Sequence, residues 1–243
     1  MTILKRPDGR KPDEIRPMKA KVGIVPNADG SAMFQFGNTI AIAAVYGPKE
    51  LHPKNQRDPE KGTLRCTYNM ISFSVDDRIR PGPSRRSMEI SKISEWALDP
   101  VVMIKKYAGN VIDVHIQILQ ADASTRCAGI NAAAMALAHA GIPMKDLVSS
   151  ISIGKLDKSL VVDVNKAEED WEDGEGATDI AMSFTHNDKK LTHIQLDGHI
   201  TPKELAEAVK LGREASDKIY EIQKKALKNV GEEISEWQLK HQD

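Results

Sequence analysis

Alternation of apolar and polar residues predicts a β-sheet in the first half of the chain. Three successive ranges show the period of two that is typical of strands with one buried face: Lys19–Val25, Ala32–Phe36 and Thr39–Tyr46. Turn-forming residues at Asn27–Gly30 and Gly37–Asn38 separate these ranges, so we expect an antiparallel meander. Two later ranges are also expected to be strands: Cys66–Val75 and Val111–Leu119.

Helical spacing of apolar residues predicts two helices beside these strands. The first begins near Ser84 and ends before Asp99-Pro100, and a short helix over Val101–Tyr107 follows it. The second covers the alanine-rich range Cys127–Ala140, and Gly141 ends it. Between these segments, Pro48–Gly62 is polar and contains prolines, which predicts a long exposed loop.

The last hundred residues predict two hairpins and the longest helix. The hairpin strands are expected at Ser149–Ile153 with Leu160–Val164, and at Ile180–Phe184 with Leu191–Leu196. Thr201 and Glu204 form the pattern of a capping box at the start of the helix, and Gly231 is expected to end it. Strands and helices are mixed without strict βα alternation. The sequence therefore predicts an α+β fold, in which mixed β-sheets pack against α-helices.

The totals are those of a soluble globular protein. The chain has 243 residues, 40% hydrophobic and 28% charged, and a formal net charge of −1. We expect a single domain over 1–243, with halves at roughly 1–145 and 146–243. Only two cysteines are present, no apolar run approaches a membrane span, and the first residues lack the apolar core of a secretory signal. These features predict a cytoplasmic location and no membrane partner.

A candidate anion site lies where the strand Val111–Leu119 is followed by the alanine-rich helix. Ser124, Thr125 and Arg126 fall at this helix N-terminus, where free backbone N–H groups and the helix dipole favour a negative charge. Two hydroxyls and a guanidinium suit a phosphate. The same residues are also compatible with an ordinary N-cap followed by a surface arginine, so both interpretations remain open from the pattern alone.

Two adjacent arginines, Arg85 and Arg86, fall at the start of the helix that begins near Ser84. Cations at a helix N-terminus oppose its dipole, so the pair indicates either an anionic ligand or a solvated helix end.

An acidic run lies between the two predicted hairpins. Its members are Glu168, Glu169, Asp170, Glu172, Asp173, Glu175 and Asp179. Carboxylates this close repel one another unless a cation neutralises them. Asp179 directly precedes a predicted strand, so its position would be fixed. The run could hold Mg²⁺ or Mn²⁺, supply a general acid, or be a solvated loop.

Together these segments resemble the RNase PH family, and within it the catalytic subunits of archaeal exosome rings. The matching segments cover nearly the whole chain: Arg6–Arg10, Gly37–Thr39, Val45–Pro48, Arg80–Ser91, Leu119–Arg126, Val162–Asn165 and Gln195–Gly198. Each segment is weak by itself, but their number and order are highly specific. The resemblance implies an RNase PH-like fold with a β-α-β-α core. It also implies phosphate-dependent 3′→5′ degradation of single-stranded RNA to nucleoside diphosphates.

The resemblance assigns binding roles to named residues. Inorganic phosphate, the co-substrate, would be bound by Ser124, Thr125, Arg126 and the backbone amide of Cys127. Phosphates of the RNA 3′ end would be bound by Arg85 and Arg86, with Arg80 and Lys92. The loop from His52 to Gly62 resembles the segment that narrows the central channel of the ring. There Arg57 and Lys61 would contact RNA without reading its sequence.

The resemblance also implies two catalytic aspartates six residues apart, which either bind the metal or, in the case of Asp179, protonate the leaving 3′ hydroxyl. Asp179 matches the second of them, judged by its distance from Gln195–Gly198, and Asp173 has the right spacing to be the first. This chain carries a few extra residues between Asp163 and Asp179, however, and Asp170 follows acidic residues as the family's first aspartate does. The first carboxylate therefore remains open between Asp170 and Asp173.

Three functions are compatible with these residues. The first is a phosphorolytic exoribonuclease in a hexameric ring with a homologous non-catalytic subunit and RNA-binding cap proteins. The second is a non-catalytic paralogue that builds the ring, which would be expected to lack Thr125-Arg126 or Asp179. The third is a hydrolytic metal-dependent nuclease, which would leave the triplet Ser124-Thr125-Arg126 without a role.

Overall fold

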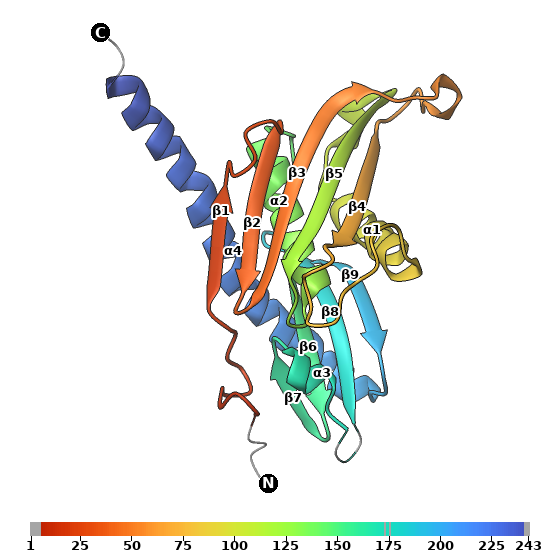
Figure 1. Ribbon diagram of the computed structural model, residues 1–243, viewed down its shortest axis with the longest axis vertical. Coiled ribbons are helices and arrows are strands. Elements are labelled where there is room, and N and C mark those ends of the chain that lie inside the picture. Colours follow the sequence, from red (N-terminus) through yellow and green to blue (C-terminus); the bar gives the residue numbers. More distant parts are fainter. Residues whose placement is uncertain (1–5, 173, 175, 241–243) are drawn as a thin grey trace.

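Two β-sheets with helices packed against them make up the computed structural model, which describes residues 6–172, 174 and 176–240 (Figure 1). The first sheet has five strands in the order β1-β2-β3-β5-β4. Their bounds are Met18–Val22, Gly30–Phe36, Thr39–Glu50, Thr63–Met70 for β4 and Asn110–Gln120 for β5. All neighbouring pairs are antiparallel except β4 with β5, which are parallel. The predicted meander and the mixed sheet are confirmed.

The second sheet has four antiparallel strands in the order β7-β6-β8-β9. Their bounds are Val148–Leu156 for β6, Ser159–Val162 for β7, Ala177–Thr185 for β8 and Leu191–Asp197 for β9. Both predicted hairpins are present. Between β7 and β8 lies a short helix that the sequence analysis did not predict, α3 over Lys166–Glu169.

Helix α2, Thr125–His139, lies between the two sheets and contacts β2, β3, β5 and β6. Its alanines and glycine let the strands approach closely. A Cβ on Gly129 would lie 2.9 Å from Cγ2 of Ile116, and one on Gly30 of β2 would lie 2.4 Å from the Ala136 carbonyl oxygen. This helix is therefore alanine-rich because strands surround it and leave little space for larger side chains.

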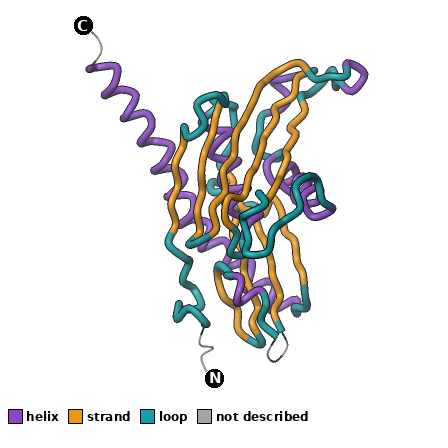
Figure 2. The backbone as a smooth tube through the Cα atoms, in the orientation of Figure 1, coloured by secondary structure: helices purple, strands orange, loops and turns teal. Residues whose placement is uncertain are grey.

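Helices α1 and α4 cover other parts of the sheets (Figures 1 and 2). α1, Arg85–Leu98, contacts β4, α2 and β9; it begins beside Ser84 as expected, and Ser84 is its N-cap. α4, Pro202–Lys240, packs mainly on β6 and β1. The expected capping box is present: Glu204 Oε2 accepts from the Thr201 backbone N–H at 2.8 Å, and the Glu204 N–H donates to Thr201 Oγ1 at 3.4 Å.

Several sequence-based boundaries were wrong. Gly231 does not end the last helix, because α4 continues to Lys240 and one glycine inside a helix costs only about 1 kcal/mol relative to alanine. The strand expected over Cys66–Val75 is β4, which starts at Thr63 and ends at Met70, where the parallel pairing with β5 stops. The loop after β3 contains a 3-10 helix at Lys54–Gln56, and the short helix before β5 is a 3-10 helix at Ile104–Tyr107.

Candidate active site

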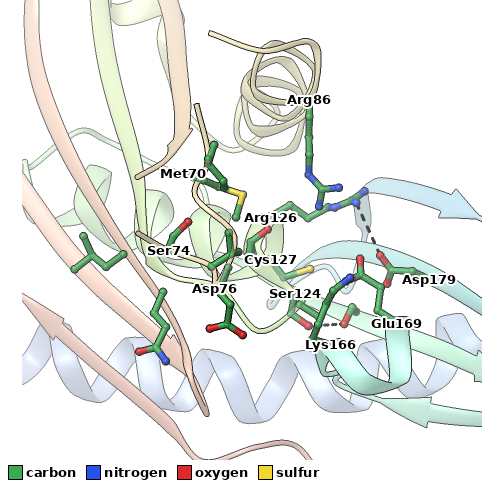
Figure 3. A pocket seen from close by; sticks show the side chains of 18 of the residues that line it. Met70, Ser74, Asp76, Arg86, Ser124, Arg126, Cys127, Lys166, Glu169 and Asp179 are labelled. Carbon is green, nitrogen blue, oxygen red and sulfur yellow. Dashed lines mark hydrogen bonds and ion pairs between the residues drawn. The ribbon is translucent and has the colours of Figure 1, made fainter. Parts of the chain in front are cut away.

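A cavity of about 750 Å³ opens where the end of β5 and the start of α2 meet β8 of the second sheet (Figure 3). Residues from both sheets and three connecting segments line it. They are Met70, Phe73, Ser74, Val75, Asp76, Asp77, Ile79, Arg86, Leu119, Gln120, Ala121, Ala123, Ser124, Thr125, Arg126, Cys127, Ser152, Lys166, Glu169, Asp179 and Ala181. The structure thus brings the whole Ser124–Cys127 segment, Arg86 and Asp179 to one cavity.

The N-terminus of α2 faces this cavity without a side-chain cap. Ser124 occupies the N-cap position, but its backbone is left-handed, with φ +53°, and its side chain makes no capping hydrogen bond. Instead its hydroxyl lies 2.7 Å from Ser152 Oγ and donates to the Val164 carbonyl at 2.9 Å. The ordinary N-cap interpretation of Ser124 is therefore wrong. Backbone N–H groups of the first helical turn remain available to an anion.

A buried ion pair between Arg16 and Asp163 holds the turn before α2 in place. Arg16 donates from Nε to Asp163 Oδ2 at 2.8 Å and from Nη2 to Asp163 Oδ1 at 2.7 Å. The same guanidinium donates to the Asp122 carbonyl at 2.6 Å and to the Val164 carbonyl at 3.2 Å. Asp163 in turn lies beside the Ser124 hydroxyl, 3.3 Å from its Oγ. Arg16, in the segment that leads into β1, thus holds the left-handed turn before α2.

Asp179 and Arg126 form the charged centre of the cavity. Arg126 Nη2 lies 3.9 Å from Asp179 Oδ2, whereas Asp179 Oδ1 is buried and has no hydrogen-bond partner among the described residues (Figure 3). Burial raises the pKa of Asp179, the nearby Arg126 opposes that shift, and the carboxylate of Glu169 adds to it. Asp179 is therefore an acid that is more readily protonated than an ordinary aspartate.

A residue from β9 that the sequence analysis did not select orients Arg126. Gln195 accepts a hydrogen bond from Arg126 Nη1 through its side-chain oxygen and donates from Nε2 to Glu89 Oε1 of α1 at 2.7 Å. This chain of contacts joins α2, β9 and α1. Gln195 lies in the segment Gln195–Gly198 that carried part of the family resemblance, and this was the available signal.

Of the four arginines and lysines assigned to the RNA 3′ end, the structure places one in the cavity. Arg86 extends from the first turn of α1 toward Arg126 and Asp179 (Figure 3). Arg85, Arg80 and Lys92 are exposed and do not line the cavity. Lys92 donates to Glu95 Oε2 at 2.6 Å on the outer surface of α1.

Glu169 is the member of the acidic run that joins Asp179 in the described part of the cavity. Asp170 does not line the cavity; its side chain is 61% exposed and accepts from Lys166 Nζ at 2.7 Å. Asp173 lies outside the described residues. Glu169 comes to the cavity because α3 starts directly after its N-cap, Asn165. Asn165 and Glu168 form a capping box, and their N-x-x-E spacing could have been recognised in the sequence.

Arg57 and Lys61, which were expected to contact RNA from the channel loop, lie away from this cavity. Parallel pairing aligns Thr63 of β4 with Val111 of β5 and Met70 with Ile118. The loop before Thr63 is therefore at the opposite end of these strands from the cavity (Figure 1). Arg57 there donates to Glu50 Oε2 at 2.7 Å, and Lys61 is exposed.

Within residues 6–172, 174 and 176–240, no three metal-ligating side chains form a cluster. The buried, unpartnered Asp179 Oδ1 nevertheless has the chemistry of a hard oxygen ligand for Mg²⁺ or Mn²⁺. Among these same residues, no helix is long and apolar enough to span a membrane.

Comparison with known proteins identifies relatives over most of the chain. The chain is 47% identical over 223 residues to exosome complex component Rrp41 of Methanopyrus kandleri, covering 92% of each protein. It is 49% identical over 224 residues to the Rrp41 component of Thermococcus kodakarensis, covering 92% of this chain and 88% of that protein.

Solved structures share the fold. The crystal structure of rice Rrp46 superposes with a TM-score of 0.81 at 27% identity, covering 92% of this chain and all of that one. A structure of the Archaeoglobus fulgidus exosome with RNA bound to the active site gives a TM-score of 0.78 at 22% identity, covering 89% and 92%.

Family descriptions match both halves of the chain. Residues 14–143 match domain 1 of the 3′ exoribonuclease family, and residues 146–215 match domain 2. Together with the relatives above, these matches confirm the predicted RNase PH-like fold. The chain belongs to the RNase PH family of 3′ exoribonucleases.

Proposed function

We propose that this protein is a phosphorolytic 3′→5′ exoribonuclease that works as the catalytic subunit of an exosome ring. The observation that carries the proposal is the joining of an uncapped helix N-terminus, Arg126, Arg86 and the buried acid Asp179 in one cavity. Cations and backbone N–H groups suit two anions, the attacking phosphate and the phosphodiester, which must lie close together. RNA, a second RNase PH-like subunit and RNA-binding cap proteins are the partners we propose, and cytoplasm the location.

Each residue of the cavity then has a task. Inorganic phosphate binds at the first turn of α2, against the N–H groups near Thr125 and Cys127, with its charge offset by Arg126. A phosphate oxygen attacks the last phosphorus, the bond from that phosphorus to the 3′ oxygen breaks, and a nucleoside diphosphate is released. Arg86 and Arg126 stabilise the negative charge that develops on the transferred phosphoryl group.

Asp179 is placed to supply the proton that the leaving 3′ oxygen needs. Its raised pKa favours that role, because the carboxyl keeps its proton to a higher pH than an ordinary aspartate does. Asp179 Oδ1, with Asp173, could alternatively hold Mg²⁺ or Mn²⁺, which would supply further charge neutralisation at the reacting phosphate.

Two alternatives predict other outcomes. A ring-building paralogue would bind RNA and release no nucleotide. A hydrolytic nuclease would release nucleoside monophosphates without phosphate, and it would leave the uncapped N-terminus of α2 without a ligand.

Product analysis separates these functions. The protein, alone and with its paired ring subunit, is incubated with 3′-tailed single-stranded RNA and Mg²⁺, with and without phosphate. We expect phosphate-dependent release of nucleoside diphosphates, and loss of that release in Asp179→Asn and Arg126→Met. Asp188→Asn is a matched control, because this exposed carboxylate pairs with Lys190 and does not line the cavity.

The same assay decides the open carboxylate. Activity that survives in Asp170→Asn and is lost in Asp173→Asn would support Asp173 as the first catalytic aspartate; the reverse would support Asp170. Monophosphate release without phosphate would refute phosphorolysis, and no release with the partner present would favour the paralogue.

A further inference from the structure

The rim of the cavity carries an aromatic side chain that the proposed mechanism does not use. Phe73 lies in the connection between β4 and α1 and is 79% exposed, the largest exposed fraction among the large hydrophobic side chains up to residue 229 whose burial the structure describes. Single exposed apolar side chains are common on protein surfaces, but Phe73 also lines the charged cavity, where an aromatic ring can contact a ligand.

The backbone around Phe73 is held firmly in this position. The Ser74 N–H donates to the Ile71 carbonyl at 2.9 Å and closes a turn, and the Ile79 N–H donates to the Ser72 carbonyl at 3.1 Å. The Ala121 N–H donates to the Ser74 carbonyl at 2.8 Å, which ties the turn to the segment just before α2. Phe73 is thus presented at a fixed place relative to the proposed phosphate site.

The surroundings of Phe73 suit a base of the RNA. A second hollow of about 390 Å³, lined by Ser72, Phe73, Val75, Asp76 and Arg78, shares this ring with the main cavity. The carboxylate of Asp76 would repel a phosphate but can accept from an exocyclic amine of a base. In Figure 3, Ser74 and Asp76 lie on one side of the cavity, and Arg86, Arg126 and Asp179 lie on the other.

We propose that Phe73 is the stacking platform for a base near the 3′ end of the RNA, with its sugar-phosphate backbone directed toward Arg86 and Arg126. This inference rests on the proposed function, since it takes single-stranded RNA as the ligand. Base–aromatic stacking accepts any base, so such a platform holds the strand without selecting its sequence. It therefore adds affinity for the strand through a base, beside Asp76, while Arg86 and Arg126 hold the phosphates.

An abasic scan combined with Phe73→Ala tests the platform. The assembled protein with its partner subunit is given RNA strands that carry one abasic site, placed in turn at each of the last four nucleotides. Binding is read by fluorescence anisotropy without phosphate, and phosphorolysis is measured separately. The platform is therefore tested even if no diphosphate is released, and the two proposals can fail independently.

We expect Phe73→Ala to weaken binding of intact RNA roughly 5- to 150-fold, the range of one lost stacking contact, with no change in the KM for phosphate. Phe73→Trp should retain binding, because indole also stacks. At one position the abasic site should weaken binding to the wild type by a similar factor and add nothing in Phe73→Ala. Met103→Ala, an exposed apolar side chain that does not line the cavity, should bind as the wild type does.

Two results would overturn the platform. Equal losses in wild type and Phe73→Ala at every abasic position would mean that no base stacks on this ring. Unchanged RNA binding, with a smaller assembly in analytical ultracentrifugation, would mean that Phe73 is a contact between subunits.

Discussion

The buried pair Arg16–Asp163 provides a quantitative test of how the turn before α2 is held. The side chain of Asp163 is 0% exposed and that of Arg16 is 6% exposed. Replacing the arginine in Arg16→Met keeps most of the volume and removes the charge. Asp163 then keeps the Arg16 backbone N–H at 2.8 Å, but its nearest remaining cation is Arg10, at 3.4 Å.

The expected loss follows from leaving a carboxylate buried without its main partner. Breaking one side of a buried ion pair costs about 3–5 kcal/mol. The double variant Arg16→Met/Asp163→Asn removes both charges, and asparagine tolerates the left-handed φ of +58° found at Asp163. The Asp122 and Val164 carbonyls then lose a donor, and two longer ion contacts are lost, Arg16–Asp122 at 3.6 Å and Arg10–Asp163 at 3.4 Å. Counting about 1 kcal/mol for each of the two hydrogen bonds and little for the longer contacts, the double variant should lose about 2 kcal/mol.

Urea unfolding at one fixed protein concentration measures both variants. With an m-value of about 2 kcal/mol/M, the single variant should lower the midpoint by roughly 2 M and the double variant by about 1 M. If the double variant is as unstable as Arg16→Met, the loss does not come from the unpaired carboxylate and the reasoning is wrong. The KM for phosphate should also rise in Arg16→Met, since the Ser124 turn presents the N-terminus of α2.

Three further outcomes are expected. Burial raises the pKa of Asp179, so the folded chain binds that proton more tightly than the unfolded chain, and the ionised carboxylate destabilises the fold above this pKa. Asp179→Asn should therefore be inactive, yet more stable than the wild type at pH 7 in thermal melts. This difference in stability should vanish below the ordinary aspartate pKa of 3.8. The same difference at pH 7 and below 3.8 would contradict the prediction. Burial raises the pKa of the Cys127 thiol to about 12, so a thiol-specific reagent at pH 8 should modify it only in urea; rapid native labelling at this residue would show otherwise. Gly30→Ala should lower the free energy of unfolding by about 1–3 kcal/mol, because its Cβ would lie 2.4 Å from the Ala136 carbonyl oxygen; an unchanged denaturation midpoint would contradict that packing.

Local patterns in the sequence were sufficient for much of the fold. The period of two in the first strands and the capping residues Ser84 and Thr201 are local features, and the structure has the elements they predict. The predicted boundaries were wrong where strand pairing decides them, as at Met70, where β4 stops beside β5. They were also wrong where a helix tolerates a glycine, as at Gly231.

Only part of the candidate site could be predicted from the sequence. The segment from Ser124 to Cys127 is contiguous, so its position before a helix could be seen along the chain. Gln195 acts on Arg126 from 69 positions away, and Glu169 reaches the cavity through a helix of four residues. No local pattern records such contacts, because they depend on how the two sheets pack.

By itself, the sequence determined which segments form most of the strands and helices, and it placed the start of α2 to within two residues, since these properties depend on neighbours within a few positions. The tertiary structure alone decided that Arg16 meets Asp163, 147 positions later, and that Ser124 takes up a left-handed backbone beside them. Non-glycine residues seldom adopt that conformation, so only contacts made by distant segments can stabilise it. Those contacts leave the N-terminus of α2 uncapped and open toward Arg126, Arg86 and Asp179.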